Sequence, residues 1–397
     1  MAPIQRMVHR VWMFLLLTVL LLSFPMYVTA ETPKAEEIFE KIVQASRTVD
    51  FQGNLTLFTQ MPMGNPISEA QVIRKAPDKQ RIEFTWPNEI RGTGIVINGE
   101  QRWPIRDDRE RRGRPFLAPP PNRMMDEFPL KQIKHIMQNY DIHVMDGGII
   151  ADRNTYLLEI EPKVTGKPSR KIWVDAEKNV MLKVENYDSQ KRLRGFYLYN
   201  NIDFDSKIDE AVFRKESEAG NGKSQRPGRG REELWNVNQG KPDLDRIRKA
   251  ARIDVIVPDQ LPAGFTLQSI ESLSFGERRN VHLRYTDGLA TLSVFQSLSK
   301  DEERGGRHSG RGEGRPQRPE GGPQGPEGGP QRPDRPPETG TATKKMNIDG
   351  VECEVMSTGP MVILRWNYKT VFFTLMGELE QKQMTEIAGS FISKGDG

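Results

Sequence analysis

The period of the hydrophobic positions changes along the chain, and each period predicts a different kind of element. From 34 to 49 the apolar side chains recur every three or four residues, which predicts an amphipathic helix, and the same spacing predicts a second helix from about 126 to 140. Around these helices apolar and polar residues alternate, as in strands that bury one face. The apolar residues expected on shared faces are Leu55 and Leu57; Ile82, Phe84 and Trp86; Tyr156, Leu158 and Ile160; Val180, Leu182 and Val184; and Phe196, Leu198, Ile202 and Phe204. Many strands and two helices predict a curved antiparallel sheet that packs around or against the helices.

A second folded region is predicted after a break in the pattern. Residues 215–241 are rich in Gly, Pro, Ser and charged side chains, which is typical of a linker between domains. A short helix is expected from Asp243 to Arg252, and alternation resumes at Ile253. Asp287-Gly288 stands between two alternating stretches, which predicts a β-hairpin. Three further strands and a closing helix with Met384, Ile387, Ala388 and Phe391 on one face complete a small α+β domain over 242–397.

One segment inside that second domain has a different composition. Residues 301–340 contain 11 Gly and 8 Pro and not one aliphatic side chain. Such a segment cannot bury enough apolar surface to offset the entropy lost on ordering its backbone. We therefore predict a disordered insertion at 301–340.

The first 30 residues carry the three-part pattern of an export signal. Arg6 and Arg10 precede an apolar run over 11–22, and Val28-Thr29-Ala30 offers a cleavage site before Glu31. The run is too short to span a bilayer core of about 30 Å, although an uncleaved anchor helix is the alternative. No cysteine lies near the cleavage site, which argues against a lipoprotein anchor. We expect an exported protein, in the periplasm, that does not span the membrane after signal cleavage.

Composition and charge mainly exclude functions. One Cys in 397 residues excludes a disulfide framework and a multi-Cys metal site, and five His leave little material for a His-rich metal centre. The net charge of +4 does not demand a nucleic-acid partner, and acidic residues offset the Arg-Gly clusters at 229–231 and 311–312. A basic loop at 106–114 is expected to be solvated, with contact to an anionic lipid headgroup or an acidic peptide as the alternative.

No catalytic constellation is recognisable in the sequence. Gly222-Lys223-Ser224 lacks the earlier glycine of a phosphate-binding loop, because that position is Ser217. Ser297 and Lys300 have the spacing of a nucleophile and its base, but the serine ends a predicted strand rather than lying on a helix. Cys353 lies between two glutamates, which disfavours the thiolate. We expect no enzyme activity, no cofactor and no metal site.

Several stretches together resemble the MucB/RseB family of periplasmic regulators. The resemblance covers most of residues 35–213 and 253–392. The segments that carry it are Gln44-Ala45-Ser46-Arg47, Phe51-Gln52-Gly53, Asn139-Tyr140-Asp141, Ile150-Ala151-Asp152-Arg153, Ile160-Glu161-Pro162-Lys163, Ile172-Trp173-Val174-Asp175, Leu182-Lys183, Leu261-Pro262-Ala263-Gly264-Phe265, Tyr285-Thr286-Asp287-Gly288-Leu289-Ala290 and Ser293-Val294-Phe295. The insertion at 301–340 and the basic, proline-rich stretch at 106–121 depart from the family's pattern and could alter a docking face.

The resemblance implies a fold and a function. It implies an α+β protein whose residues 31–214 form a LolA-like open antiparallel β-barrel with plugging helices, followed by the smaller C-terminal domain. Members of the MucB/RseB family bind the periplasmic domain of an anti-sigma factor, and lipid or lipopolysaccharide releases that domain, so the resemblance implies the same for this chain. The alternative is a LolA-type carrier or chaperone for lipids or lipoproteins.

An open barrel of this kind could admit the acyl chain of a lipid, lipopolysaccharide or lipoprotein between its sheet and its helices. An ordinary hydrophobic core explains the same apolar residues, so both interpretations stay open. The residues expected to line such a cavity are Leu55, Leu57, Ile82, Phe84, Trp86, Leu158, Val184 and Phe196.

Overall fold

The computed structural model describes residues 33–60, 67–105, 130–214, 244–251, 253–258, 261–275, 278–299, 343–358 and 360–395. The predicted export signal, the linker, the basic loop and the insertion at 301–340 lie outside these residues. Within the described ranges, no helix has the length and apolar character needed to cross a membrane.

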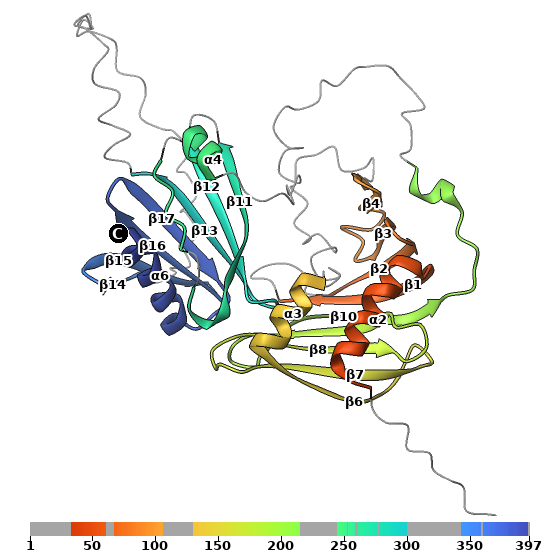
Figure 1. The fold of residues 1–397 in the computed structure, drawn as a ribbon. Helices are drawn as coiled ribbons and strands as arrows, with labels where there is room; N and C mark the ends of the chain where they lie inside the picture. The colour runs from red at the N-terminus through yellow and green to blue at the C-terminus, as the bar shows by residue number, and fades with distance from the viewer. Residues whose placement is uncertain are drawn as a thin grey trace, which may run out of the picture. The chain divides into compact units, whose positions relative to one another are not determined.

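The N-terminal domain is built on one sheet of ten antiparallel strands (Figure 1). The order is β5-β4-β3-β2-β1-β10-β9-β8-β7-β6, so β1 and β10 meet in the middle and β5 and β6 form the two ends. The strands are β1 (Phe51–Thr59), β2 (Ile67–Lys75), β3 (Lys79–Trp86), β4 (Gly94–Asn98), β5 (Gln101–Ile105), β6 (Tyr140–Ile150), β7 (Arg153–Pro162), β8 (Ser169–Asp175), β9 (Met181–Tyr187) and β10 (Leu193–Asp203).

Two helices cover one face of this sheet, which we call the inner face. They are α2 (Ala35–Thr48) and α3 (Leu130–Asn139), and Figure 1 shows both in front of the strands. Phe39 and Ile42 of α2 and Ile136 of α3 belong to the same buried cluster as the inward side chains of the sheet. Full burial of such a side chain contributes about 1.5–3 kcal/mol. The prediction of an open antiparallel sheet with helices packed against it is confirmed.

A bulge in β10 decides which of its side chains face inward. Asn54 pairs with Asn201 and Leu55 pairs with Tyr199, so Asn200 is an extra residue in the ladder. Before the bulge Tyr197 and Tyr199 face inward, and after it Ile202 and Phe204 pack against the same cluster. The expectation that Phe196 and Leu198 share a face with Ile202 and Phe204 is wrong, because the extra residue reverses the alternation.

The outer face is covered where the chain returns across it after β10. The short 3₁₀-helix η3 (Glu210–Phe213) buries Phe213 against Val96 of β4. The Glu210 carboxylate holds this segment to the strands, since it lies 2.8 Å from the Lys75 ammonium and 2.5 Å from that of Lys79. This return segment explains why residues 204–214 belong to the N-terminal domain.

The C-terminal domain has a sheet of seven antiparallel strands and helices of its own. Its order is β11-β12-β13-β17-β16-β15-β14, and the predicted hairpin at Asp287-Gly288 joins β12 to β13. The closing helix buries Met384, Ile387, Ala388 and Phe391, as its periodicity predicts. The elements are α4 (Leu244–Ala251), η5 (Pro262–Gly264), β11 (Thr266–Phe275), β12 (Arg278–Thr286), β13 (Thr291–Leu298), β14 (Lys344–Ile348), β15 (Val351–Thr358), β16 (Met361–Tyr368), β17 (Val371–Gly377) and α6 (Gln381–Gly395).

Candidate functional site

Six of the eight residues expected to line a cavity lie together in the inner-face cluster. They are at most 4% exposed and are packed with side chains of α2 and α3: Leu55, Leu57, Ile82, Phe84, Leu158 and Val184. In this arrangement they form a filled core beneath the two helices. An acyl chain would need α2 or α3 to move before it could contact them, so their role as a cavity lining stays a prediction.

The other two expected residues, Trp86 and Phe196, lie outside that cluster. Trp86 pairs with Glu69 after a register shift in β3, and its side chain is 41% exposed. Phe196 precedes the bulge in β10 and stacks on Phe58, with 5.6 Å between ring centroids. The two bulges therefore remove both residues from the inner face.

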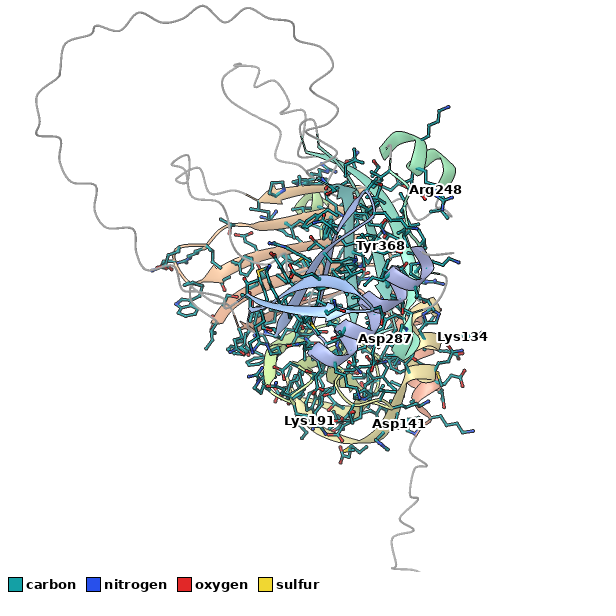
Figure 2. All side chains as sticks on the ribbon, turned by 90° about the vertical axis from the view of Figure 1, so that its left-hand side faces the viewer. Lys134, Asp141, Lys191, Arg248, Asp287 and Tyr368 are labelled. Carbon is teal, nitrogen blue, oxygen red and sulfur yellow. The ribbon has the colours of Figure 1, made fainter. Side chains whose placement is uncertain are left out.

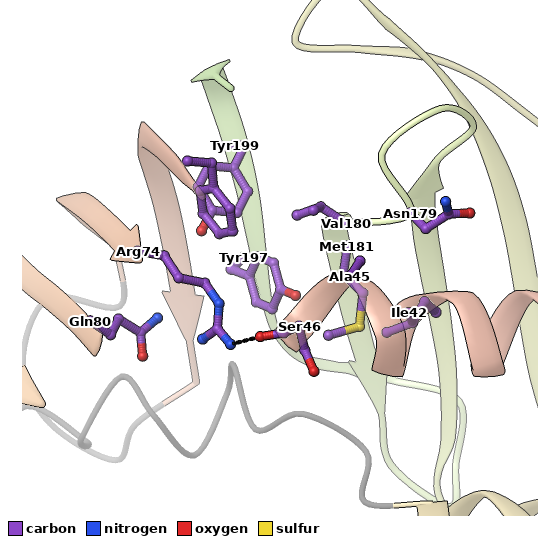
Figure 3. A pocket seen from close by; sticks show the side chains of 11 residues that line it. Ile42, Ala45, Ser46, Arg74, Gln80, Asn179, Val180, Met181, Tyr197 and Tyr199 are labelled. Carbon is purple, nitrogen blue, oxygen red and sulfur yellow. Dashed lines mark hydrogen bonds between the residues drawn. The ribbon is translucent and has the colours of Figure 1, made fainter. Parts of the chain in front are cut away.

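A small pocket opens between α2 and the strands on the inner side (Figure 3). Its volume is ≈ 60 Å³, enough for a few water molecules but well below the roughly 300 Å³ of a typical small-molecule site. Arg74 donates to the backbone oxygen of Ser46 over 2.6 Å and so satisfies a carbonyl near the end of α2. The Tyr199 hydroxyl is buried, has no hydrogen-bond partner among the described residues, and has a raised pKa because of that burial. As it stands, this pocket offers one buried donor and no room for a lipid.

The strongest polar site is a buried network that joins the two domains, which we call the domain junction. Its members are Asn139, Tyr140, Lys167, Asp287 and Gly288. The Lys167 ammonium lies 2.8 Å from the Asp287 carboxylate, and the Tyr140 hydroxyl donates to that carboxylate over 2.9 Å. Lys167 also donates to the backbone oxygen of Ala263 over 2.6 Å. Asp287 is labelled in Figure 2.

Local structure supplies partners for both oxygens of the buried Asp287 carboxylate. The second oxygen of its carboxylate accepts the amides of Leu289 at 3.1 Å and Ala290 at 2.8 Å, which is the usual behaviour of Asp in a tight turn. Hydrogen bonds and the Lys167 charge together offset the cost of removing the carboxylate from water. The Tyr140 hydroxyl stays protonated, because burial and the neighbouring Asp287 charge raise its pKa.

The end of α3 is fixed to the same network. The Asn139 side-chain amide donates to the backbone oxygens of His135 at 3.0 Å and Asp287 at 2.9 Å. The Lys163 ammonium donates to the carbonyls of Met137 and Gln138, a favourable place for a cation at a helix C-terminus. Gly288 has a φ of +107°, and a Cβ there would meet the Ile136 backbone nitrogen at 2.6 Å. A movement of α3 would therefore disturb the turn at Asp287.

Most of the junction residues are marked in the sequence only as parts of longer motifs. Asn139-Tyr140, Gly264 and Asp287-Gly288 all belong to segments that carry the family resemblance, and the structure brings them together. Lys167 lies outside those segments, and nothing in its sequence context marks it as buried. The available signal was that one C-terminal motif contains a polar turn residue, Asp287, and one N-terminal motif contains Asn139.

Of the residues weighed for catalysis, Ser297 and Cys353 are described, whereas Lys300 and residues 222–224 lie outside the described residues. Burial raises the pKa of the Cys353 thiol to about 11, which keeps it protonated and unreactive at neutral pH. His282 contacts Ser293 at 3.1 Å and stacks on Phe295. His135 lies 3.4 Å from the Thr266 hydroxyl at the domain junction. Among the residues that the structure covers, no three His, Cys, Asp or Glu side chains are grouped to hold a metal ion.

The fold and the junction define a class of protein: two α+β domains, a ten-stranded and a seven-stranded antiparallel sheet, joined through a buried ion pair. Residues 34–216 match the family model described as the MucB/RseB N-terminal domain. No curated protein gives a match.

Solved structures of MucB are similar in fold. MucB in complex with MucA(peri) has a TM-score of 0.52 at 15% identity, covering 90% of this chain and 98% of that one. The MucA/MucB complex of Pseudomonas aeruginosa has a TM-score of 0.51 at 15% identity, covering 89% and 96%. A LolA superfamily protein from Nitrosomonas europaea covers 46% of this chain and 98% of its own, with a TM-score of 0.25 and 18% identity.

Proposed function

We propose that this protein is a periplasmic, non-enzymatic regulator that binds the exported domain of an anti-sigma factor. The observation that carries the proposal is the match of residues 34–216 to the MucB/RseB N-terminal domain. The fold likeness to MucB extends over both domains, and MucB itself has been solved bound to MucA(peri). The partner we expect is the exported domain of the anti-sigma factor encoded with this chain.

The finer part of the proposal is that a lipid, lipopolysaccharide or lipoprotein acyl chain controls this binding. Each CH₂ group that leaves water contributes about 0.8 kcal/mol, so one chain could displace a helix from the inner face. The side chains of α3 cover the inner-face cluster, while its last residue, Asn139, is hydrogen-bonded to Asp287 of the C-terminal domain. Displacement of α3 by an acyl chain would thus break contacts at the domain junction and change the surface offered to the partner.

The test is a calorimetric titration of the purified protein with the exported domain of the co-encoded anti-sigma factor. We expect a saturable one-to-one complex that lipopolysaccharide or lysophospholipid dissociates. If no lipid dissociates the complex, the proposal of lipid control is wrong, and the proposal of a regulator that binds the anti-sigma factor stands. If no complex forms and lipid co-purifies in native mass spectrometry, the results would favour a lipid carrier of the LolA type over a regulator.

A further inference from the structure

The two sheets end in four edge strands, and β6 is the longest of them. β6 has 11 residues, whereas β5 and β14 have five each, and Pro104 in β5 carries no amide hydrogen. The other long edge strand, β11, is contacted by α4, which also contacts β12. In Figure 1 β6 forms the border of its sheet, with no labelled helix or strand beyond it. A long uncovered edge is a template for pairing with another chain.

The ladder shows which backbone groups of β6 are free. The Lys163 amide donates to the Asn139 carbonyl over 3.1 Å, one residue before β6, and the register continues as Asp141↔Glu161 and His143↔Glu159. Hydrogen-bonded pairs alternate in an antiparallel ladder, so Asp141, His143 and Met145 bond to β7. The amides and carbonyls of Ile142 and Val144 therefore point away from β7, and no partner for them is found among the described residues.

The side chains along this edge are incompletely covered on both faces. Ile142 and Val144 are partly buried at the rim of the inner-face cluster, and Met145 on the outer face is 39% exposed. One more strand would cover these side chains and continue the core of the sheet. The bulge after Asp146 limits regular pairing to the stretch from Tyr140 to Asp146.

Charge selects the occupant of this edge. β6 contains Asp141 and Asp146 and no Lys or Arg, so a second copy of β6 would bring two acidic edges together. An extended peptide with apolar residues at alternate positions and basic residues between them is complementary to both the apolar rim and the acids. The edge also starts at Tyr140, a member of the domain junction.

We propose that the free edge of β6 binds such an extended, basic-apolar segment of the partner as an additional strand of the N-terminal sheet. This rests on the proposed function, because the segment belongs to the exported domain of the anti-sigma factor. Backbone hydrogen bonds of Ile142 and Val144 supply affinity, and the half-covered side chains supply selectivity.

The test is amide hydrogen exchange, resolved by residue, on the wild-type protein with and without the exported domain of the co-encoded anti-sigma factor. In the free protein the amides of Ile142 and Val144 should exchange quickly and those of His143 and Met145 slowly. Binding should slow Ile142 and Val144 at least tenfold and leave His143 and Met145 unchanged. This alternation distinguishes strand pairing from contact through side chains alone.

Variants give the second arm of the test. Val144→Pro removes an outward amide without touching the bonds to β7, and should weaken binding at least tenfold. Met145→Lys adds a charge that opposes a basic segment, and its matched control is Leu298→Lys, because Leu298 is 40% exposed in the C-terminal domain. The control should change affinity less than twofold. The exchange measurement uses the wild-type chain and remains decisive if Val144→Pro fails to fold.

Three outcomes overturn the proposal. If the partner binds while exchange at Ile142 and Val144 is unchanged, strand addition is wrong and the proposed function stands. If these amides become protected without partner as protein concentration rises, a second copy occupies the edge. If wild-type protein does not bind the exported domain at all, the proposed function fails and this inference fails with it.

Discussion

The Lys167 ammonium lies 2.8 Å from the Asp287 carboxylate, and the two side chains are 1% and 0% exposed. One belongs to the loop between β7 and β8 and the other to the turn between β12 and β13. Because each charge is buried, neither domain can release the other without leaving an unpaired ion or rehydrating it. This pair therefore connects the stability of the two domains.

Lys167→Met should be strongly destabilising. The substitution keeps much of the side-chain volume but leaves Asp287 buried without its cation, a change that costs about 3–5 kcal/mol. Urea unfolding measures the loss. The control is Lys41→Met, because the Lys41–Glu37 pair is about half exposed and such solvated pairs contribute little to stability. Equal effects of the two substitutions would contradict a structural role for the buried pair.

Gly288→Ala should destabilise the protein more than Gly350→Ala does. Both glycines have positive φ, +107° and +84°, so both substitutions strain the backbone by about 1–2 kcal/mol. At Gly350 a Cβ would meet nothing within 4 Å, whereas at Gly288 it would meet the Ile136 nitrogen at 2.6 Å. The difference in melting temperature between the two variants measures the cost of the contact with Ile136. Equal melting temperatures would contradict this contact.

Substitution of Tyr140 and of Tyr199 by Phe should change the stability of the protein in different directions. Tyr140→Phe removes a hydrogen bond to a buried carboxylate and should cost about 1.5–3 kcal/mol. Tyr199→Phe removes a buried hydroxyl that has no partner among the described residues, and should be neutral or stabilise by up to about 1 kcal/mol. Chemical denaturation measures both. A large loss for Tyr199→Phe would show that the pocket holds a bound group that uses this hydroxyl.

The Glu210 carboxylate should make the N-terminal domain sensitive to acid. Hydrogen bonds from Lys75 and Lys79 lower the pKa of Glu210 from its ordinary 4.5 to about 2. A lowered pKa contributes stability that is complete above about 4.5 and is lost as the pH falls towards 2. The difference in urea midpoint between wild type and Glu210→Gln should therefore shrink over that range. A difference that is constant from pH 6 to pH 2 would refute the assignment.

Hydrophobic periodicity was sufficient to predict the helices, most strands and the fold class. It succeeded for α2 and α6 because each buries one continuous stripe, and for the Asp287-Gly288 turn because the flanking alternation is regular. It failed at Trp86 and Phe196, where one extra residue in β3 and one in β10 reverse the faces. The hydrophobic pattern around Asn200 does not reveal the bulge, because the bulge appears only in the pairing of β10 with β1.

The domain junction could not be predicted for a different reason. Asn139, Lys167 and Asp287 are far apart in sequence, and a polar residue in a turn is normally solvated. Only the packing of η5 and the β12–β13 turn beside the end of α3 makes these groups neighbours. Family motifs drew attention to Asn139 and Asp287, yet they gave no indication that the two are hydrogen-bonded.

The strand order of the C-terminal sheet sets the distance that the chain must cover between β13 and β14. β13 and β14 run parallel and are separated by β17, β16 and β15, a gap of about 20 Å across the sheet. A return over that distance and along β14 requires on the order of ten extended residues, and the chain supplies the 43 residues 300–342. Most of that length is surplus to the connection. Changes in the length or sequence of residues 300–342 should therefore leave every strand pairing of the domain intact.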